Sequence, residues 1–287
     1  MFENVLVGVD GRPSGRDAIA LASCLMDAGG QLTLAHVHGG ELSPMHAITP
    51  GLIAREREAS EQLLERERAA AAVRAELVSI VAMSAGRGLH ERAEQQGADL
   101  LVVGSCAYGP FGRAMLGDDT RAALNGAPCA VAIAARGYAQ GPDGAGPGGS
   151  LRTIGVGYDD APESAAALAL ARALAERTRA RVLALDVVTM PGYVFTGLMP
   201  VALGESIDVM VSEAQARMRA LPGVEGRAVY GLSGEELAAF GEGLDLLVVG
   251  SRGYGAARRL ILGSTSNYLE RHARCSLLVL PRAAARP

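Results

Sequence analysis

Lysine and tryptophan are both absent from the 287-residue chain, so each of its 27 basic residues is an arginine. The absence of lysine excludes a Walker-type phosphate-binding lysine, a Schiff-base lysine and a lysine general base. Positive charge is not in excess either, because the formal net charge is −4. A chain of this kind offers no electrostatic footprint for nucleic acid or for an anionic membrane surface.

Cysteines are few and widely spaced: Cys24, Cys106, Cys129 and Cys275 form no CxxC pair and no metal-binding framework. We interpret them as incidental or buried thiols in a reducing compartment. No apolar run approaches the roughly 18 residues that a membrane span needs, and the N-terminus lacks a basic region followed by an apolar one. We therefore expect a cytoplasmic protein without a nucleic-acid or membrane partner.

An internal repeat organises the sequence. The seven letters of Asp99–Ser105 recur without change in Asp245–Ser251, and a Val-Gly-x-Asp motif occurs at both Val7–Asp10 and Val156–Asp159. A seven-letter identity with collinear matches indicates a duplication.

The two copies are separated by a stretch rich in glycine and proline, residues 137–150. This composition is expected to forbid helix and strand and is typical of a flexible linker. The sequence therefore predicts a first domain at residues 1–136 and a second domain at residues 151–287.

Within each copy, short apolar runs alternate with helical patterns, which predicts βαβ units and a parallel sheet. The fold class is therefore α/β, with two tandem five-stranded parallel-sheet domains of Rossmann-like type. The strands are expected at Asn4–Val9, Gln31–Val37, Leu77–Ala82, Asp99–Gly104 and Cys129–Ala134 in the first copy, and at Thr153–Tyr158, Arg181–Val187, Arg227–Tyr230, Asp245–Gly250 and Ser276–Leu280 in the second. The first copy's helices are expected at Ser14–Ala28, about 53–74, Leu89–Gln96 and Asp118–Asn125.

A glycine loop follows the fourth strand of the second copy. It contains Gly250, Arg252 and Gly253 and then, after nine residues, Gly263 followed by Ser264, Thr265 and Ser266. Glycines let the backbone approach a phosphate, and hydroxyl residues at a helix N-terminus attract anions. Ligands in such sheets bind beyond the carboxyl ends of the strands. The pattern predicts a phosphate site, with a purely structural loop and helix cap as the alternative.

The first copy departs from this pattern, since Ala107 replaces the second glycine and Asp118 stands where the second copy has Ser264. Two unit charges about 4 Å apart repel by about 4 kcal/mol at an effective dielectric constant near 20. We therefore expect the first copy to bind a triphosphate weakly or not at all. Asp10 and Asp159, at the ends of the first strands, suit contacts to ribose or adenine, or cap the following helix.

The Val-Gly-x-Asp opening, the Asp-Leu-Leu-Val-Val-Gly-Ser strand and the Gly-x2-Gly-x9-Gly-Ser loop occur in order, and with them the chain resembles a tandem universal stress protein. The resemblance implies an adenine nucleotide alpha hydrolase-like fold that holds ATP, ADP or AMP, with Mg²⁺ left open. It implies that Asp159 contacts the nucleoside, that the Val187 backbone meets adenine, and that ribose and phosphates lie on Gly250, Gly253, Gly263, Ser264 and Thr265. It also implies pairing through last strands, here as an intrachain pseudo-dimer, with a homodimer left open.

Three functions remain in view: a nucleotide-binding stress-response or regulatory protein, a slow ATPase, and a nucleotide-free scaffold for a protein partner. The sequence shows no nucleophile–base pair near the loop and no acidic cluster for two metal ions, so any catalysis is expected to be weak ATP hydrolysis. His36 and His38 share one strand face and could form a metal pair, but no third ligand converges on them. The apolar stretch Pro191–Gly204 is a candidate loop over the nucleotide or a partner site.

Overall fold

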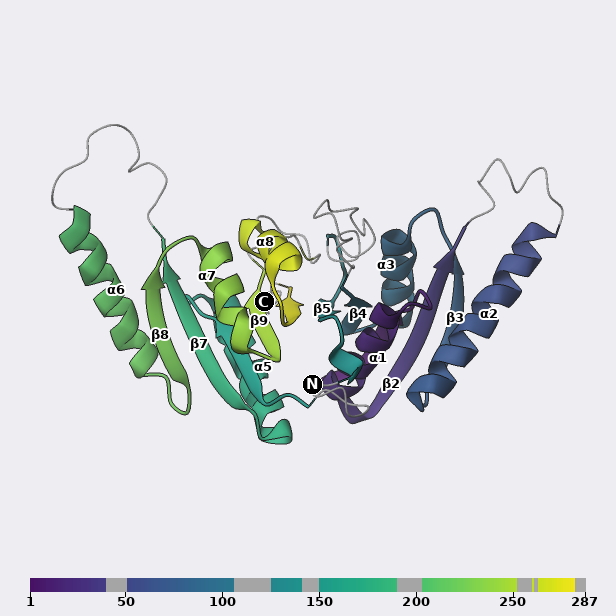
Figure 1. Cartoon of the computed structure of the whole chain (residues 1–287), viewed down its shortest axis with the longest axis horizontal. Coiled ribbons are helices and arrows are strands. Elements are labelled where there is room, and N and C mark those ends of the chain that lie inside the picture. Colours follow the sequence, from purple (N-terminus) through teal and green to yellow (C-terminus); the bar gives the residue numbers. More distant parts are fainter. Residues whose placement is uncertain are drawn as a thin grey trace, which may run out of the picture. The chain divides into compact units, whose positions relative to one another are not determined.

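The computed structural model describes residues 1–39, 51–105, 125–140, 150–189, 203–251, 260 and 263–281. The chain divides into two compact units, one containing Met1–Ser150 and the other containing Leu151–Gly250 and Gly263–Leu277. Each unit is a β-sheet with helices packed on both faces (Figure 1). None of the described helices is long and apolar enough to cross a membrane.

The first unit has the strand order β3-β2-β1-β4-β5, and its neighbouring strands run parallel. Its elements are β1 (Phe2–Gly8), α1 (Pro13–Leu25), β2 (Met26–His38), α2 (Leu52–Ala71), β3 (Glu76–Val81), α3 (Ala85–Gln96), β4 (Leu100–Gly104), β5 (Ala130–Ala134) and the 3-10 helix η1 (Tyr138–Gln140).

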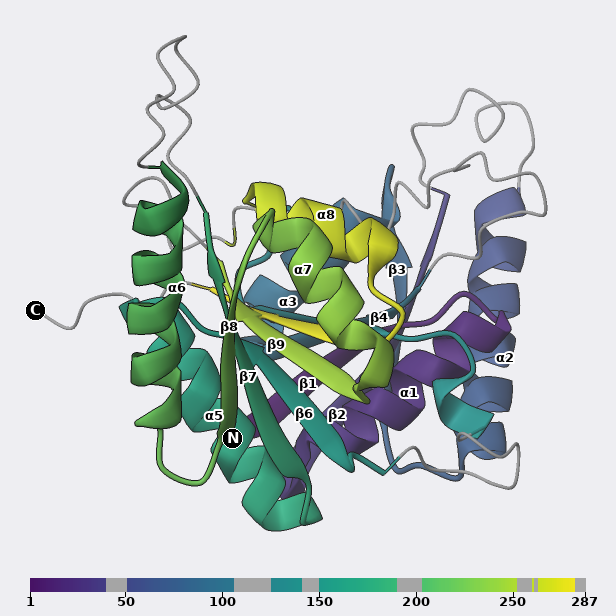
Figure 2. The same ribbon diagram turned by 60° about the vertical axis from the view of Figure 1, so that its left-hand side comes forward.

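The second unit repeats this arrangement in the order β10-β9-β6-β7-β8. Its elements are β6 (Thr153–Gly157), α5 (Pro162–Thr178), β7 (Arg181–Val188), α6 (Leu203–Arg219), β8 (Glu225–Tyr230), α7 (Ser233–Phe240), the 3-10 helix η3 (Gly241–Gly243), β9 (Leu246–Gly250), α8 (Ser264–His272) and β10 (Ser276–Leu280). In this unit α7 and α8 lie side by side (Figure 2). The α/β fold with two parallel five-stranded halves is confirmed.

The central strands carry the core of each unit. Leu100, Leu101 and Val102 of β4 are fully buried, and so are the three matching residues of β9. This pattern without polar alternation arises because the strands are covered on both faces. In the first unit α1 packs on one face of β4, while α3 contacts β1 from the other.

Several element boundaries differ from the sequence prediction; the largest differences are that β2 begins at Met26 rather than Gln31 and that α3 begins at Ala85 rather than Leu89. Helix α1 ends at Leu25 rather than Ala28, because Met26 already has extended backbone angles and pairs with Phe2 of β1. Strand β8 begins at Glu225, two residues before the expected start. The expected helix Asp118–Asn125 lies outside the described residues apart from Asn125.

The start of the expected flexible linker is ordered. The Asp17 carboxylate on α1 is buried and accepts hydrogen bonds from the backbone N–H of Gly137 at 2.9 Å and of Ala139 at 2.8 Å. Residues 138–140 form η1, which packs on α1. The prediction that this composition forbids helix is therefore wrong for these residues, because a buried carboxylate supplies acceptors for their N–H groups.

Candidate functional site

The order of strands reverses in the middle of the second unit. Strand β6 pairs with β7 through Val156 and Ala184 and pairs with β9 through Val156 and Val248. The chain runs outward from β6 to β7 and β8, and then returns to β9 on the other side of β6. The carboxyl ends of β6 and β9 therefore form a topological switch point, which is where ligands bind in such sheets.

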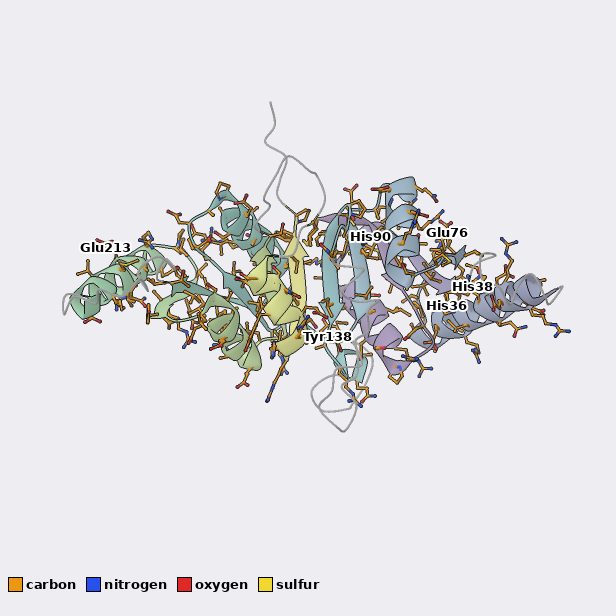
Figure 3. The ribbon with its side chains drawn as sticks, turned by 90° about the horizontal axis from the view of Figure 1, so that it is seen from above. His36, His38, Glu76, His90, Tyr138 and Glu213 are labelled. Carbon is orange, nitrogen blue, oxygen red and sulfur yellow. The ribbon has the colours of Figure 1, made fainter. Side chains whose placement is uncertain are left out.

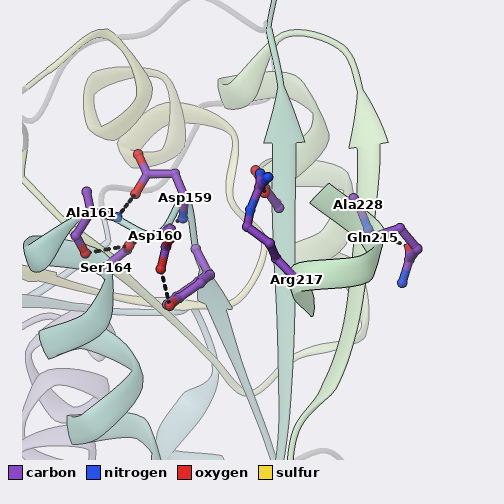
Figure 4. A network of polar contacts seen from close by, with 9 residues as sticks. Asp159, Asp160, Ala161, Ser164, Gln215, Arg217 and Ala228 are labelled. Carbon is purple, nitrogen blue, oxygen red and sulfur yellow. Dashed lines mark hydrogen bonds and ion pairs between the residues drawn. The ribbon is translucent and has the colours of Figure 1, made fainter. Parts of the chain in front are cut away.

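Asp159 follows β6 at this switch point and shapes the turn into α5. Its carboxylate Oδ1 accepts a hydrogen bond from the Ala161 backbone N–H at 3.3 Å, and its own N–H donates to Ser164 Oγ at 3.3 Å. Asp160 between them takes the left-handed backbone conformation, with a φ of 62°. Figure 4 shows this network. The helix cap expected as an alternative for Asp159 is not formed, because Ala161 is the N-cap residue of α5 and has no side-chain cap bond; Asp159 instead stabilises the turn that precedes the helix.

The first unit builds the same turn. Asp10 Oδ1 accepts a hydrogen bond from the Arg12 backbone N–H at 3.0 Å, and Gly11 is left-handed with a φ of 76°. An Asp at this position thus has a structural reason in both units, whether or not a ligand is present. Contact between Asp159 and a nucleoside stays a prediction.

Gly250 ends β9 and lies against the first turn of α5. A Cβ atom at Gly250 would stand 2.7 Å from the Cβ of Glu163 and 2.9 Å from its carbonyl carbon. The matching Gly104 is equally confined, because a Cβ there would overlap the Ser14 carbonyl oxygen at the start of α1. Both glycines are needed for close helix–strand packing, a reason that the phosphate interpretation did not include.

Helix α8 begins at the same edge of the sheet as Gly250, because it returns the chain from the end of β9 to the start of β10. Gly263 is its N-cap residue, and the Gly263 carbonyl accepts the Asn267 N–H at 3.0 Å. The backbone N–H groups of Ser264, Thr265 and Ser266 have no acceptor within the helix. Ser264 is exposed, whereas Ser266 is buried. This end of α8 therefore presents N–H groups and a hydroxyl to an anion.

A buried carboxylate that the sequence analysis missed lies beside Val187. Asp186 on β7 is 5% exposed, and the Arg217 guanidinium of α6 lies 3.2 Å from its Oδ2. Burial raises the pKa of Asp186, Arg217 opposes that rise, and the nearby carboxylates of Asp159 and Asp160 add to it. The available signal was a single acidic residue inside an otherwise aliphatic strand.

Val187 itself is half-buried in β7, where it pairs with Val229 of β8. Tyr158, just after β6, donates its backbone N–H to the Leu185 carbonyl. The end of β7 thus lies next to the Asp159 turn, as the prediction for an adenine-facing Val187 requires.

The described part of this edge has two chemical sides. The exposed carboxylates of Asp159 and Asp160 lie on the β6–β7 side, where they can accept hydrogen bonds from hydroxyl or amino groups, whereas Asp186 is buried and bonded to Arg217. The N-terminus of α8 lies on the β9 side and suits negative charge. Arg252 and Gly253 lie outside the described residues.

The first copy's loop cannot be compared with this arrangement, because residues 106–124, with Ala107 and Asp118, lie outside the described part. The apolar stretch Pro191–Gly204 also lies outside it apart from the backbone of the first turn of α6.

The two strand histidines each contact a separate local group. His36 Nδ1 lies 2.7 Å from the Val9 carbonyl oxygen, and His38 Nε2 lies 2.9 Å from Ser79 Oγ. Figure 3 shows both on β2, at a distance from His90. Among the described residues no group of three or more His, Cys, Asp or Glu side chains could hold a metal ion.

Comparison with known proteins identifies the repeat. The model of the universal stress protein family matches residues 1–135 and again residues 150–281. The chain is 32% identical over 136 residues to a universal stress protein of Thermus aquaticus, a match that covers 45% of this chain and 98% of that protein. It is 29% identical over 188 residues to a universal stress protein of Mycobacterium tuberculosis strain H37Rv, covering 63% of this chain and 61% of that protein.

Solved structures support the same fold over the full length. A universal stress protein from Archaeoglobus fulgidus superposes with a TM-score of 0.66 at 17% identity, and the match covers 98% of each chain. A protein from Pseudomonas aeruginosa described as a putative universal stress protein superposes with a TM-score of 0.62 at 16% identity, covering 97% of this chain and 93% of that one.

Proposed function

This chain belongs to the universal stress protein family, with two family domains in tandem, and from that premise we propose that its second domain binds an adenine nucleotide. The family is a stress-response group whose members often bind adenine nucleotides. The observation that carries the proposal is the N-terminus of α8, which lies at the same edge of the sheet as the ends of β6 and β9, the edge that holds the switch point.

The two chemical sides of the site suggest how the nucleotide lies. Its phosphates occupy the end of α8, held by the N–H groups of residues 264–266 and by the Ser264 and Thr265 side chains, with Arg252 adding charge. Its ribose and adenine lie on the other side, at Asp159 and the Val187 backbone. The ligand is ATP, ADP or AMP. If Mg²⁺ accompanies it, the ion takes most of its ligands from phosphate oxygens and water, as is usual for this ion.

We assign this activity to residues 151–287 and a structural or regulatory role to residues 1–136, joined by residues 137–150. The two domains form an intrachain pseudo-dimer. The protein acts in the cytoplasm as a nucleotide-dependent regulator without nucleic-acid or membrane partners, and hydrolysis of ATP is at most slow.

Calorimetric titration of the full chain with ATP, ADP and AMP tests the proposal. Ser264→Asp imports the residue that the first copy carries as Asp118, whereas Ser264→Asn is a neutral control of nearly the same size. We expect one nucleotide per chain, normal affinity in the Asn variant and no measurable binding in the Asp variant, because a carboxylate repels phosphate.

Other outcomes would overturn specific parts of the proposal. Two equivalent nucleotides per chain would refute the preference for the second domain. Equal binding by the Asp and Asn variants would refute the placement of the phosphates at the end of α8. No binding of any nucleotide would favour the partner-binding scaffold, and multiple-turnover release of phosphate would favour an ATPase.

A further inference from the structure

The outermost strand of the first unit, β3, has one strand neighbour in the part of the chain that the structure describes. The Ala82 backbone N–H, just after β3, donates to the His38 carbonyl of β2. The even-numbered residues of β3 therefore direct their backbone N–H and C=O groups toward β2. Because these directions alternate along a strand, the N–H and C=O groups of Leu77, Ser79 and Val81 point outward. Such a row of groups is a template for another strand.

The matching edge of the second unit is closed by one side chain. Gln215 on α6 donates from Nε2 to the Gly226 carbonyl at 3.1 Å and accepts the Ala228 N–H at Oε1, at 2.9 Å. Figure 4 shows Gln215 beside Ala228 of β8. The amide thus makes the two backbone bonds that a further strand would make.

No such closure exists on β3 among the described residues. Glu76 and Glu225 both open their edge strands, so Leu77 and Ser79 correspond to Gly226 and Ala228. Instead of a capping amide, a groove of about 810 Å³ lies between α2 and β3. Its lining includes the side chains of Leu77 and Ser79 on the strand and of Leu64 on the helix.

The sequence of β3 is complementary to itself about Ser79. In an antiparallel pair of two β3 strands centred there, Ser79 faces its own copy and Leu77 faces Val81. Each of these is a hydrogen-bonded pair that exchanges two backbone bonds. On the other face Val78 meets Ile80, so the non-hydrogen-bonded pairs are apolar and β-branched, which stabilises a sheet.

From this geometry we propose that β3 joins the β3 strand of a second copy of this chain, so that the two first units share one continuous sheet. The incoming Ser79 and Val81 side chains enter the groove beside α2. Val81 is 41% exposed and Met83 71% exposed, and pairing covers the apolar end of the strand. Strand β8 cannot pair in this way, because Gln215 occupies its edge and Arg227 would face Val229 of the other copy.

Sedimentation velocity of the full chain, over a dilution series, tests the proposal. Val81→Lys places a charge opposite Leu77, and Tyr230→Lys makes the same change at the matching position of β8. We expect wild type and Tyr230→Lys to show the same monomer–dimer equilibrium. For Val81→Lys we expect a dissociation constant roughly tenfold higher or more, from lost pairs and lost backbone bonds.

Two further variants keep the test decisive if Val81→Lys folds poorly. Ser79→Pro removes an outward N–H that the ladder to β2 does not use, so it should fold and be monomeric. Ser79→Cys should form a disulfide-linked dimer under mild oxidation, since Cα atoms in such a pair lie about 5.5 Å apart. A wild-type chain that stays monomeric, a dimer indifferent to both Val81→Lys and Ser79→Pro, or equal loss in Tyr230→Lys would overturn the proposal.

Discussion

Replacing Gly250 by alanine separates the two reasons for having glycine at the end of β9. If the glycine served only a bound phosphate, nucleotide-free protein would tolerate a methyl group there. In the structure that methyl group would stand 2.7 Å from the Cβ and 2.9 Å from the carbonyl carbon of Glu163. These atoms belong to the first turn of α5 and its backbone, so they cannot rotate away as the end of a side chain can.

The size of the effect follows from two opposing terms. Overpacking of this kind costs about 1–3 kcal/mol. Alanine has less conformational entropy than glycine in the unfolded chain, and this offsets about 0.4–1 kcal/mol of that cost. We therefore expect Gly250→Ala to lower the free energy of unfolding by about 1–2 kcal/mol. For a chain of this size, each kcal/mol lowers Tm by roughly 2–4 °C.

Gly243→Ala is the matched control, because a Cβ at Gly243 in the same unit has no neighbour within 4 Å. Both variants are compared with wild type, without nucleotide, by thermal and urea unfolding followed by circular dichroism, since the chain lacks tryptophan. Equal stability of the two variants, within about 0.5 kcal/mol, would refute the packing argument and return Gly250 to a role in ligand binding alone.

Three other predictions rest on buried polar groups. Asp17→Ala should lower stability by about 1–3 kcal/mol and make the start of the linker a protease site, because two backbone N–H groups lose their acceptor; an unchanged digestion pattern would argue against this. Cys129 and Cys275, whose pKa burial raises to about 12, should resist iodoacetamide at pH 8, where about one thiol in ten thousand is ionised; mass spectrometry showing labelling as fast as in urea would contradict it. Because the pKa of Asp186 is raised in the folded state, its contribution to stability is greatest in acid and is lost as pH rises. Arg217→Ala should steepen that loss as the pH rises above about 4, the ordinary pKa of an aspartate, and a pH dependence of the free energy of unfolding equal to that of wild type would count against it.

The duplication and the aliphatic fourth strands were sufficient to predict the fold, because buried parallel strands leave a pattern in local sequence. The sequence could also place Asp159 at the end of a strand and offer a structural role for it beside a binding role. The helix cap expected of Asp159 is in fact a hydrogen bond within the preceding turn, since α5 begins two residues later than a capping Asp159 would require.

What the sequence could not predict depends on contacts between distant segments. Helix α1 stops at Leu25 because Met26 pairs with Phe2, and no local signal marks that end. The distance from Gly250 to Glu163 is likewise a property of packing. Asp186 appears as one acidic letter in a strand, and only the fold shows that it is buried beside Arg217.

Gln215 also sets a limit on growth. Gene duplication of a domain with an open sheet edge yields a chain with two such edges, and a bivalent unit of this kind can add to itself without end, as fibres do. With the β8 edge occupied by Gln215 of α6, the proposed strand addition is confined, among the edge strands that the structure describes, to β3. Removal of that side chain, for example in Gln215→Ala, would expose a second edge and leave only the mismatch of Arg227 with Val229 to oppose polymerisation.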